Sequence, residues 1–85
     1  DIIGREKFFM KKMKISLGSI EDVKEFVALT NSYSFDSDLV SGRYAVDAKS
    51  IMGIFSLDLS KELTLNIHSD DCADFLDAIK KYIVK

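Results

Sequence analysis

Apolar and polar residues alternate in four short segments of the chain, and this alternation constrains the fold more than any other feature. It is clearest in residues 62–68, where Leu63, Leu65 and Ile67 are apolar and the residues between them are polar. Because successive side chains of a strand point to opposite faces, each such strand has one buried face and one wet face. Strands of this kind predict an antiparallel sheet that helices cover on one side only.

The other three strands are expected to begin near Met13, Phe35 and Tyr44. Ser41 and Gly42 separate the last two of these strands. Because glycine tolerates a positive φ, this pair predicts a tight hairpin turn. Two neighbouring strands are therefore expected to be joined directly, without a helix between them.

Two helices are predicted between the strands. Ser19 is a candidate N-cap, because its hydroxyl can accept a hydrogen bond from the amide of Asp22, and the helix that it opens should end near Asn31. Ser50 is a second candidate N-cap, and the short helix after it is apolar on every side. A helix of that kind is either buried or covers a partner.

A third helix is expected to open at Ser69, Asp70 and Asp71. Its apolar residues recur at helical spacing and form one stripe, made of Cys72, Phe75, Leu76, Ile79, Tyr82 and Ile83. The predicted order is therefore β-α-β-β-α-β-α, which corresponds to one α+β domain.

The composition excludes several classes of protein. The chain has 85 residues, 47% of them hydrophobic, with one cysteine and a formal charge of -2. No apolar run approaches the roughly 18 residues of a membrane span, so we expect no membrane insertion. A single cysteine cannot form an internal disulfide framework, so we predict a cytoplasmic location. We also expect the chain to be a monomer.

The charge is spread unevenly along the chain. Residues 1–14 carry +3 and the remainder carries -5. A basic start with an acidic body offers no broad phosphate-binding face, so nucleic acid is not expected as a partner. Residues 1–9 show no sustained periodicity, and we therefore predict that residues 1–12 are an extension or the start of the first strand and that residues 13–85 are the folded domain.

The run Ala48–Gly53, with the sequence Ala-Lys-Ser-Ile-Met-Gly, resembles the regulatory-serine motif of the HPr family. These are the histidine-containing phosphocarrier proteins of the bacterial sugar phosphotransferase system. The element order matches that family across about residues 13–85. The resemblance implies an HPr-like open-faced β-sandwich, in which a four-stranded antiparallel sheet of order 1-4-2-3 carries three helices on one face.

The carrier site of the family is altered in this chain. In the family, the active histidine lies seven residues before a Phe-Val pair. Here that pair begins at Phe26, and counting back seven residues leads to Ser19. The family's arginine position is Glu21, and the position that is usually proline is Asp22. A serine phosphate ester is a poor phosphoryl donor, and Glu21 adds negative charge where phosphoryl transfer needs cations, so we predict no catalytic residue at this site.

The resemblance points to a different site at the second helix. Ser50 corresponds to a serine that a dedicated kinase phosphorylates in some family members, and the plain N-cap role is expected whether or not this serine is phosphorylated. The same segment supplies an apolar docking patch in the family, where it meets enzyme I, the sugar-specific transporter components and regulators. We therefore predict that Lys49, Ile51, Met52 and Phe55 bind partners through the Ser50–Phe55 segment.

His68 is the only histidine of the chain and thus the only possible relocated carrier. Alternation places it on the outward face at the end of a strand, where a solvent-facing role is expected. Together with Asp70 and Asp71 it has the ligand types of a metal site. Acids at a helix start are favourable dipole partners, however, and we predict no metal and no cofactor. Cys72 is expected to be a small buried residue.

Three functions remain open. The first is a degenerate phosphocarrier that acts as a protein-binding or regulatory module in the phosphoenolpyruvate-dependent sugar phosphotransferase system. The second is a working carrier that uses His68 or accepts phosphate at Ser50. The third is a scaffold domain unrelated to sugar transport. No enzyme is predicted, because the chain has no nucleophile and base pair and no glycine-rich phosphate loop.

Overall fold

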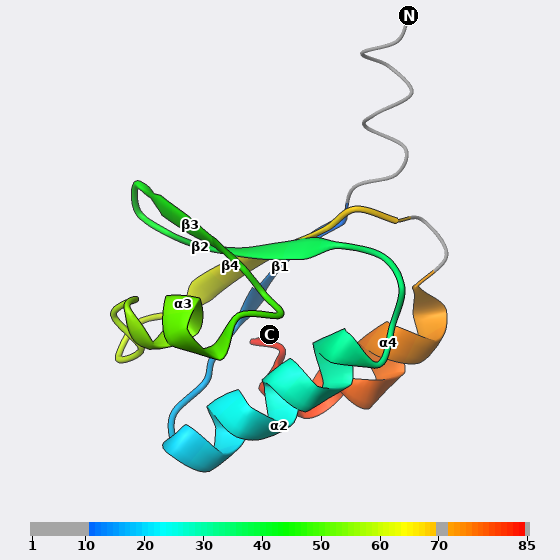
Figure 1. The fold of residues 1–85 in the computed structure, drawn as a ribbon, viewed down its shortest axis with the longest axis horizontal. Coiled ribbons are helices and arrows are strands. Elements are labelled where there is room, and N and C mark those ends of the chain that lie inside the picture. The colour runs from blue at the N-terminus through cyan, green and yellow to red at the C-terminus, as the bar shows by residue number, and fades with distance from the viewer. Residues whose placement is uncertain (1–10, 70–71, 85) are drawn as a thin grey trace, which may run out of the picture.

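The computed structural model describes residues 11–69 and 72–84, and its elements follow the predicted order (Figure 1). The strands are β1 (Lys11–Ile15), β2 (Ser37–Ser41), β3 (Tyr44–Asp47) and β4 (Leu63–Ile67). The helices are α2 (Ile20–Asn31), α3 (Ile51–Phe55) and α4 (Ala73–Ala78), and α4 is followed by a 3₁₀ turn, η1 (Lys80–Tyr82).

The four strands form one antiparallel sheet in the order β1-β4-β2-β3. Leu65 of β4 lies opposite Met13 of β1 and Leu39 of β2, so the apolar residues of neighbouring strands share one face. Asn66 lies opposite Asp38 on the other face. The predicted alternation and the strand order 1-4-2-3 are therefore both confirmed.

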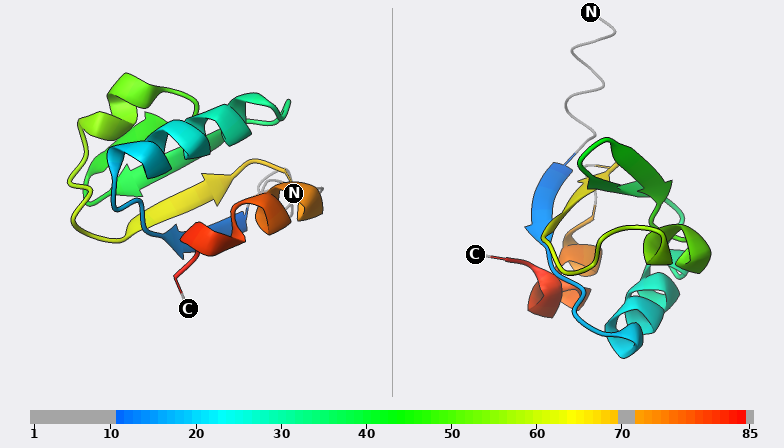
Figure 2. Two further views of the ribbon diagram at one scale, coloured as in Figure 1. Left: turned by 90° about the horizontal axis from the view of Figure 1, so that it is seen from below. Right: turned by 90° about the vertical axis from the view of Figure 1, so that its left-hand side faces the viewer.

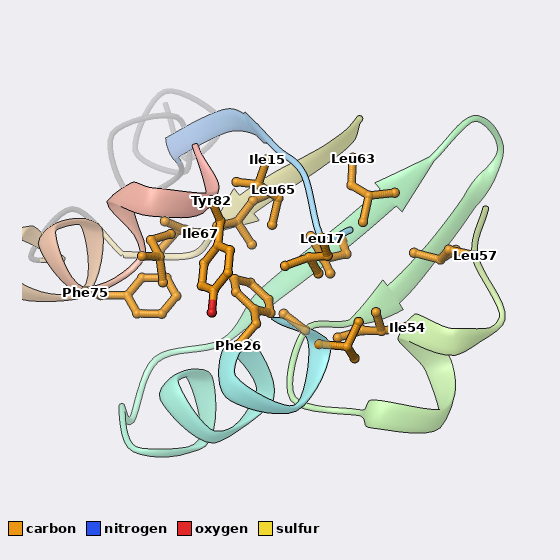
Figure 3. Packing of buried hydrophobic residues seen from close by; sticks show 14 of the residues in the cluster. Ile15, Leu17, Phe26, Ile54, Leu57, Leu63, Leu65, Ile67, Phe75 and Tyr82 are labelled. Carbon is orange, nitrogen blue, oxygen red and sulfur yellow. The ribbon is translucent and has the colours of Figure 1, made fainter. Parts of the chain in front are cut away.

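All three helices cover the apolar face of the sheet, and the opposite face is open (Figures 1 and 2). Phe26 of α2, Phe75 of α4 and Tyr82 of η1 are buried between the helices and the sheet (Figure 3). The rings of Phe26 and Tyr82 meet edge to face, with 6.0 Å between their centroids. Such pairs contribute about 1 kcal/mol beyond the burial of their apolar area.

The β2–β3 hairpin has the predicted tight turn. Ser41 and Tyr44 face each other at the ends of the two strands, so Gly42 and Arg43 form a two-residue loop. Gly42 has φ of +60°, a conformation that costs a residue with a Cβ more than it costs glycine. Among the described residues Gly42 is the one with a positive φ, which matches a turn with glycine at its first central position.

The last helix is shorter than the sequence predicts. α4 ends at Ala78, and the chain continues as η1 before Ile83 adopts an extended backbone. Ile83 forms a β-bridge with Ile15, while the amide of Val84 donates to the carbonyl oxygen of Lys14 over 2.9 Å. Pairing with β1 therefore competes with helix formation at the C-terminal end. Asp70 and Asp71, the predicted helix opening, lie outside the described residues.

β1 begins at Lys11, two residues before the apolar alternation starts at Met13. The division between an extension in residues 1–12 and a domain in residues 13–85 stays a prediction. Over residues 11–69 and 72–84, no helix has the length and apolar character needed to cross a bilayer.

Candidate functional site

The start of α2 is built around Ser19. Its backbone is extended, and its hydroxyl accepts a hydrogen bond from the amide of Asp22 over 3.1 Å, so the predicted N-cap is confirmed. Ile20 is 61% exposed and Glu21 is also exposed. No basic side chain of the described residues lies within ion-pair distance of Glu21 or Asp22. The hydroxyl of Ser19 is thus occupied as a cap, next to unneutralised acids.

α3 also begins with a serine cap, but the residues around this cap differ from those at the start of α2. The hydroxyl of Ser50 accepts a hydrogen bond from the amide of Gly53 over 3.1 Å, and the first turn contains no acid. A Cβ at Gly53 would lie 3.1 Å from the Cβ of Val46. α3 therefore packs closely against β3, and a side chain at Gly53 would require Val46 to shift by a few tenths of an ångström.

α3 buries few of its side chains. Ile54 is fully buried, whereas Met52 is 76% exposed and Phe55 is 39% exposed. Ile51 and Lys49 are half-buried. The structure thus places the predicted partner-binding residues on α3 and just before it. It leaves an apolar surface in contact with water, which is unusual for a residue as large as Met or Phe.

The end of α2 holds the segment that leads into α3. Thr30 donates from its hydroxyl to the carbonyl oxygen of Ala48 over 3.0 Å, and the side-chain amide of Asn31 donates to the carbonyl oxygen of Lys49 over 3.2 Å. Thr30 is 2% exposed although it is polar. The sequence interpretation missed this positioning role of Thr30 and Asn31, and the one available signal was a hydroxyl on the apolar face of a helix.

His68 lies at the opposite end of the sheet from Ser19. Ile67, its neighbour in β4, pairs with Lys11 at the start of β1, whereas Ser19 follows the end of β1. Nε2 of His68 lies 2.8 Å from Oδ2 of Asp38, and both side chains are partly exposed. In the described parts of the chain, no three His, Cys, Asp or Glu side chains converge as metal ligands would.

A second polar cluster fastens the C-terminal segment to α2. The phenol of Tyr82 donates to the carboxylate of Glu25, and Nζ of Lys81 lies 2.7 Å from the same carboxylate. Hydrogen bonds from Lys81 and Tyr82 hold the pKa of Glu25 below its usual value. Burial of the phenol and the neighbouring carboxylate raise the pKa of Tyr82 well above its usual value. This cluster supports the fold and lies away from α3.

Comparisons with known proteins identify the family and the fold. The family model described as "PTS HPr component phosphorylation site" matches residues 22–85. The crystal structure of HPr-C-His from Thermoanaerobacter tengcongensis superposes with a TM-score of 0.70 at 26% identity, over 84% of this chain and 88% of that chain. A phosphocarrier protein HPr from Bacillus anthracis superposes with a TM-score of 0.68 at 24% identity, over 88% and 98%. Among curated protein sequences none matches.

Proposed function

The chain belongs to the HPr family, and from that premise we propose that it is a degenerate phosphocarrier that acts as a protein-binding or regulatory module of the sugar phosphotransferase system. Proteins of this family carry phosphate between other proteins of that system and are not enzymes. We propose that this chain keeps the docking surface, has lost the carrier site, and works as a monomer in the cytoplasm without nucleic acid as a partner.

One observation carries the docking part of this proposal, namely the exposure of Met52 and Phe55 on α3. Both are flexible or aromatic residues of the kinds that protein interfaces favour. Lys49 lies just before the helix, where it would act as a charged residue at the rim that orients a partner. Ile51 is half-buried and packs against the hydrophobic core.

The residues at the start of α2 support the loss of the carrier site. The resemblance assigns the family's histidine position to Ser19 and its arginine position to Glu21. The Ser19 hydroxyl already accepts a hydrogen bond from Asp22. A phosphoryl group at this position would meet the carboxylate of Glu21, whereas transfer requires cations that stabilise the charge. The matched family region also begins after these positions, at residue 22.

Regulation through Ser50 is a further part of the proposal. A phosphate on this hydroxyl would lie beside the apolar surface of α3, and no acid in the first turn would repel it. It would also replace the hydrogen bond that Gly53 donates to the hydroxyl. A kinase of the host could thus switch the docking surface by adding charge at its edge.

A second candidate function, a carrier that uses His68, is favoured by the contact between His68 and Asp38. A carboxylate 2.8 Å from Nε2 would fix the ring orientation and leave Nδ1 as the nucleophile. Acid-labile phosphate that disappears in His68→Ala would establish this function. The neighbouring Asp38 and Asp47, opposite each other on β2 and β3, would oppose it by repelling an incoming phosphoryl group.

The proposed function is tested by calorimetric titration of the chain against purified enzyme I, the sugar-specific components and the regulators of its host's phosphotransferase system. We expect binding to at least one of these proteins. Binding to none would leave a scaffold domain unrelated to sugar transport, and the proposal would then be wrong.

A further inference from the structure

The turn that joins β3 to α3 consists of Asp47, Ala48, Lys49 and Ser50. The amide of Ser50 donates to the carbonyl oxygen of Asp47 over 2.9 Å and closes the turn. The amide of Lys49 donates to Oδ1 of Asp47 over the same distance. A β-turn of this kind uses the carbonyl group of its first residue, so the carbonyl groups of its central residues, Ala48 and Lys49, have no partner inside the turn.

Both of these carbonyl groups accept hydrogen bonds from the end of α2. The hydroxyl of Thr30 donates to the carbonyl oxygen of Ala48 over 3.0 Å, and the side-chain amide of Asn31 donates to that of Lys49 over 3.2 Å. The two donors are adjacent in sequence, and each acceptor lies 18 residues further along the chain. α2 therefore fixes the orientation of the two peptide groups that immediately precede Ser50.

The two contacts differ in what they contribute to the fold. Thr30 is 2% exposed and Ala48 is fully buried, so the hydroxyl satisfies a carbonyl group that lies away from water. The contact between Asn31 and Lys49 is exposed, and water could satisfy this carbonyl group instead. The Asn31 contact therefore adds little to the stability of the fold, and orienting the turn is the role that it retains.

The backbone of Ser50 is held from the side of α3 as well. The hydroxyl oxygen of Ser50 accepts from the amide of Gly53 over 3.1 Å, and its carbonyl oxygen accepts from the amide of Ile54 over 3.0 Å. Contacts on both sides thus hold the hydroxyl in one orientation. Because a group-transfer reaction requires the reacting atoms to be aligned, this orientation affects how readily the hydroxyl reacts.

We propose that Thr30 and Asn31 are positioning residues for the phosphorylation of Ser50. In this reaction the hydroxyl oxygen of Ser50 forms a bond to the γ-phosphorus of a nucleoside triphosphate, the bond from that phosphorus to the bridging oxygen breaks, and the nucleoside diphosphate leaves. The hydroxyl proton passes to a carboxylate of the kinase. Thr30 and Asn31 act through the turn, which they hold so that the hydroxyl is oriented before the kinase binds. This inference rests on the proposed function and names the residues on which regulation at Ser50 depends.

The test measures phosphorylation of Ser50 in the full chain by the serine kinase of its host with ATP. The exchange rate of the Gly53 amide, which reports the cap at Ser50, is measured in parallel by NMR. In Asn31→Ala we expect kcat to fall about fivefold and KM to change less than about twofold, because the surface that binds the kinase is intact while the hydroxyl is less well oriented. The exchange rate of the Gly53 amide should rise about fivefold.

Three further variants separate positioning from stability. Ser32→Ala removes a hydroxyl that donates to the carbonyl oxygen of Leu29 over 2.6 Å, within the same end of α2. It should change kcat and the exchange rate of the Gly53 amide less than about twofold. Thr30→Val removes the buried donor and should lower kcat about tenfold. Thr30→Ser retains the hydroxyl and should keep kcat within about threefold of the native value.

The contrary outcomes separate this inference from the proposed function. If Ser50 is phosphorylated with the same kcat in the native chain, Asn31→Ala and Thr30→Val, the inference is wrong and the proposed function stands. A lower kcat without faster exchange at Gly53 would also overturn the inference, because the two residues would then act on the kinase directly. An equal fall of kcat in Ser32→Ala would overturn it too, since general loosening of α2 would explain the loss. No phosphate on Ser50 of the native chain would contradict the regulatory part of the proposed function as well.

Discussion

Two helices of this protein begin with the same serine cap but differ in everything that surrounds it. Ser19 and Ser50 each accept a hydrogen bond over 3.1 Å from an amide three residues later. The first turn of α2 then carries Glu21 and Asp22, whereas the first turn of α3 carries no acid and exposes Met52. The same serine cap can therefore begin a helix whatever chemistry the neighbouring residues support.

Under the proposed function, this comparison explains how one fold can keep its docking surface without its carrier site. A serine satisfies the helix start in both places, so the fold tolerates it where the resemblance expects a histidine. A phosphoryl carrier needs a nucleophile whose phosphate is a labile donor, with cations beside it, and no basic side chain of the described residues lies within ion-pair distance of Glu21 or Asp22. A docking surface needs exposed apolar area, which α3 has. The four predictions below test this difference, from the largest expected effect to the smallest.

The largest effect is expected from rebuilding the carrier chemistry at α2. In Ser19→His/Glu21→Arg, an imidazole can accept a phosphoryl group as a labile phosphoramidate, and the arginine replaces an acid by a cation. We expect acid-labile phosphate after incubation with enzyme I and phosphoenolpyruvate, detected by intact-protein mass. The single variant Ser19→His, which retains Glu21, should accept less. If the double variant folds and binds enzyme I but takes no phosphate, the comparison of the two sites is wrong.

The second prediction compares an exposed apolar residue at each helix start. Met52→Glu should weaken binding to the partner by about 30-fold, which corresponds to about 2 kcal/mol, because it places charge in the centre of the docking surface. Ile20→Glu introduces the same charge at the start of α2 and should change the affinity less than about threefold. Calorimetric titration measures both. Equal losses in the two variants would show that the docking surface includes the start of α2.

The third prediction concerns the caps themselves. Ser19→Ala and Ser50→Ala should each lower the free energy of unfolding by about 1 kcal/mol, because each leaves a helix amide without its acceptor. The loss should be larger for Ser50, which is half-buried, than for the exposed Ser19. Urea denaturation at neutral pH measures the difference. A larger loss in Ser19→Ala would mean that the α2 cap has a role that its exposure does not explain.

The smallest effect concerns the polar cluster of Glu25, Lys81 and Tyr82 that joins α2 to the C-terminal segment. The pKa of Tyr82 is raised in the folded state by burial and by Glu25. Its contribution to stability is therefore present below the unfolded pKa of about 10 and is lost as the pH rises above it. As the pH rises from about 9 to about 11, the free energy of unfolding, measured by urea denaturation, should fall less in Tyr82→Phe than in the native chain. In Tyr44→Phe, which changes an exposed tyrosine, the free energy of unfolding should fall with pH as steeply as in the native chain. An equally steep fall in Tyr82→Phe would contradict the role assigned to Tyr82.

The features that the sequence predicted correctly are local ones. The caps at Ser19 and Ser50 depend on an amide three residues away, and the strand faces depend on the alternation of neighbouring residues such as Leu63 and Leu65. The strand order joins segments that are distant in sequence, and it came from the resemblance to the HPr family rather than from periodicity.

The features that the sequence did not predict are contacts between distant residues. The side chain of His68, just after β4, contacts Asp38 on the neighbouring strand β2. α4 ends earlier than predicted because Ile83 pairs with Ile15. The hydrogen bonds from Thr30 and Asn31 to the segment before α3 belong to the same class. No pattern along the chain encodes such pairs, since each depends on how two elements pack in space.

The most direct test of the central claim is the intact mass of the native chain after incubation with enzyme I and phosphoenolpyruvate, followed by acid treatment, with His68→Ala measured in parallel. We predict no acid-labile phosphate on either protein, although the same preparation binds a protein of the phosphotransferase system. Acid-labile phosphate on the native chain that is absent from His68→Ala would contradict this prediction and show that the chain is a working carrier with its site at His68.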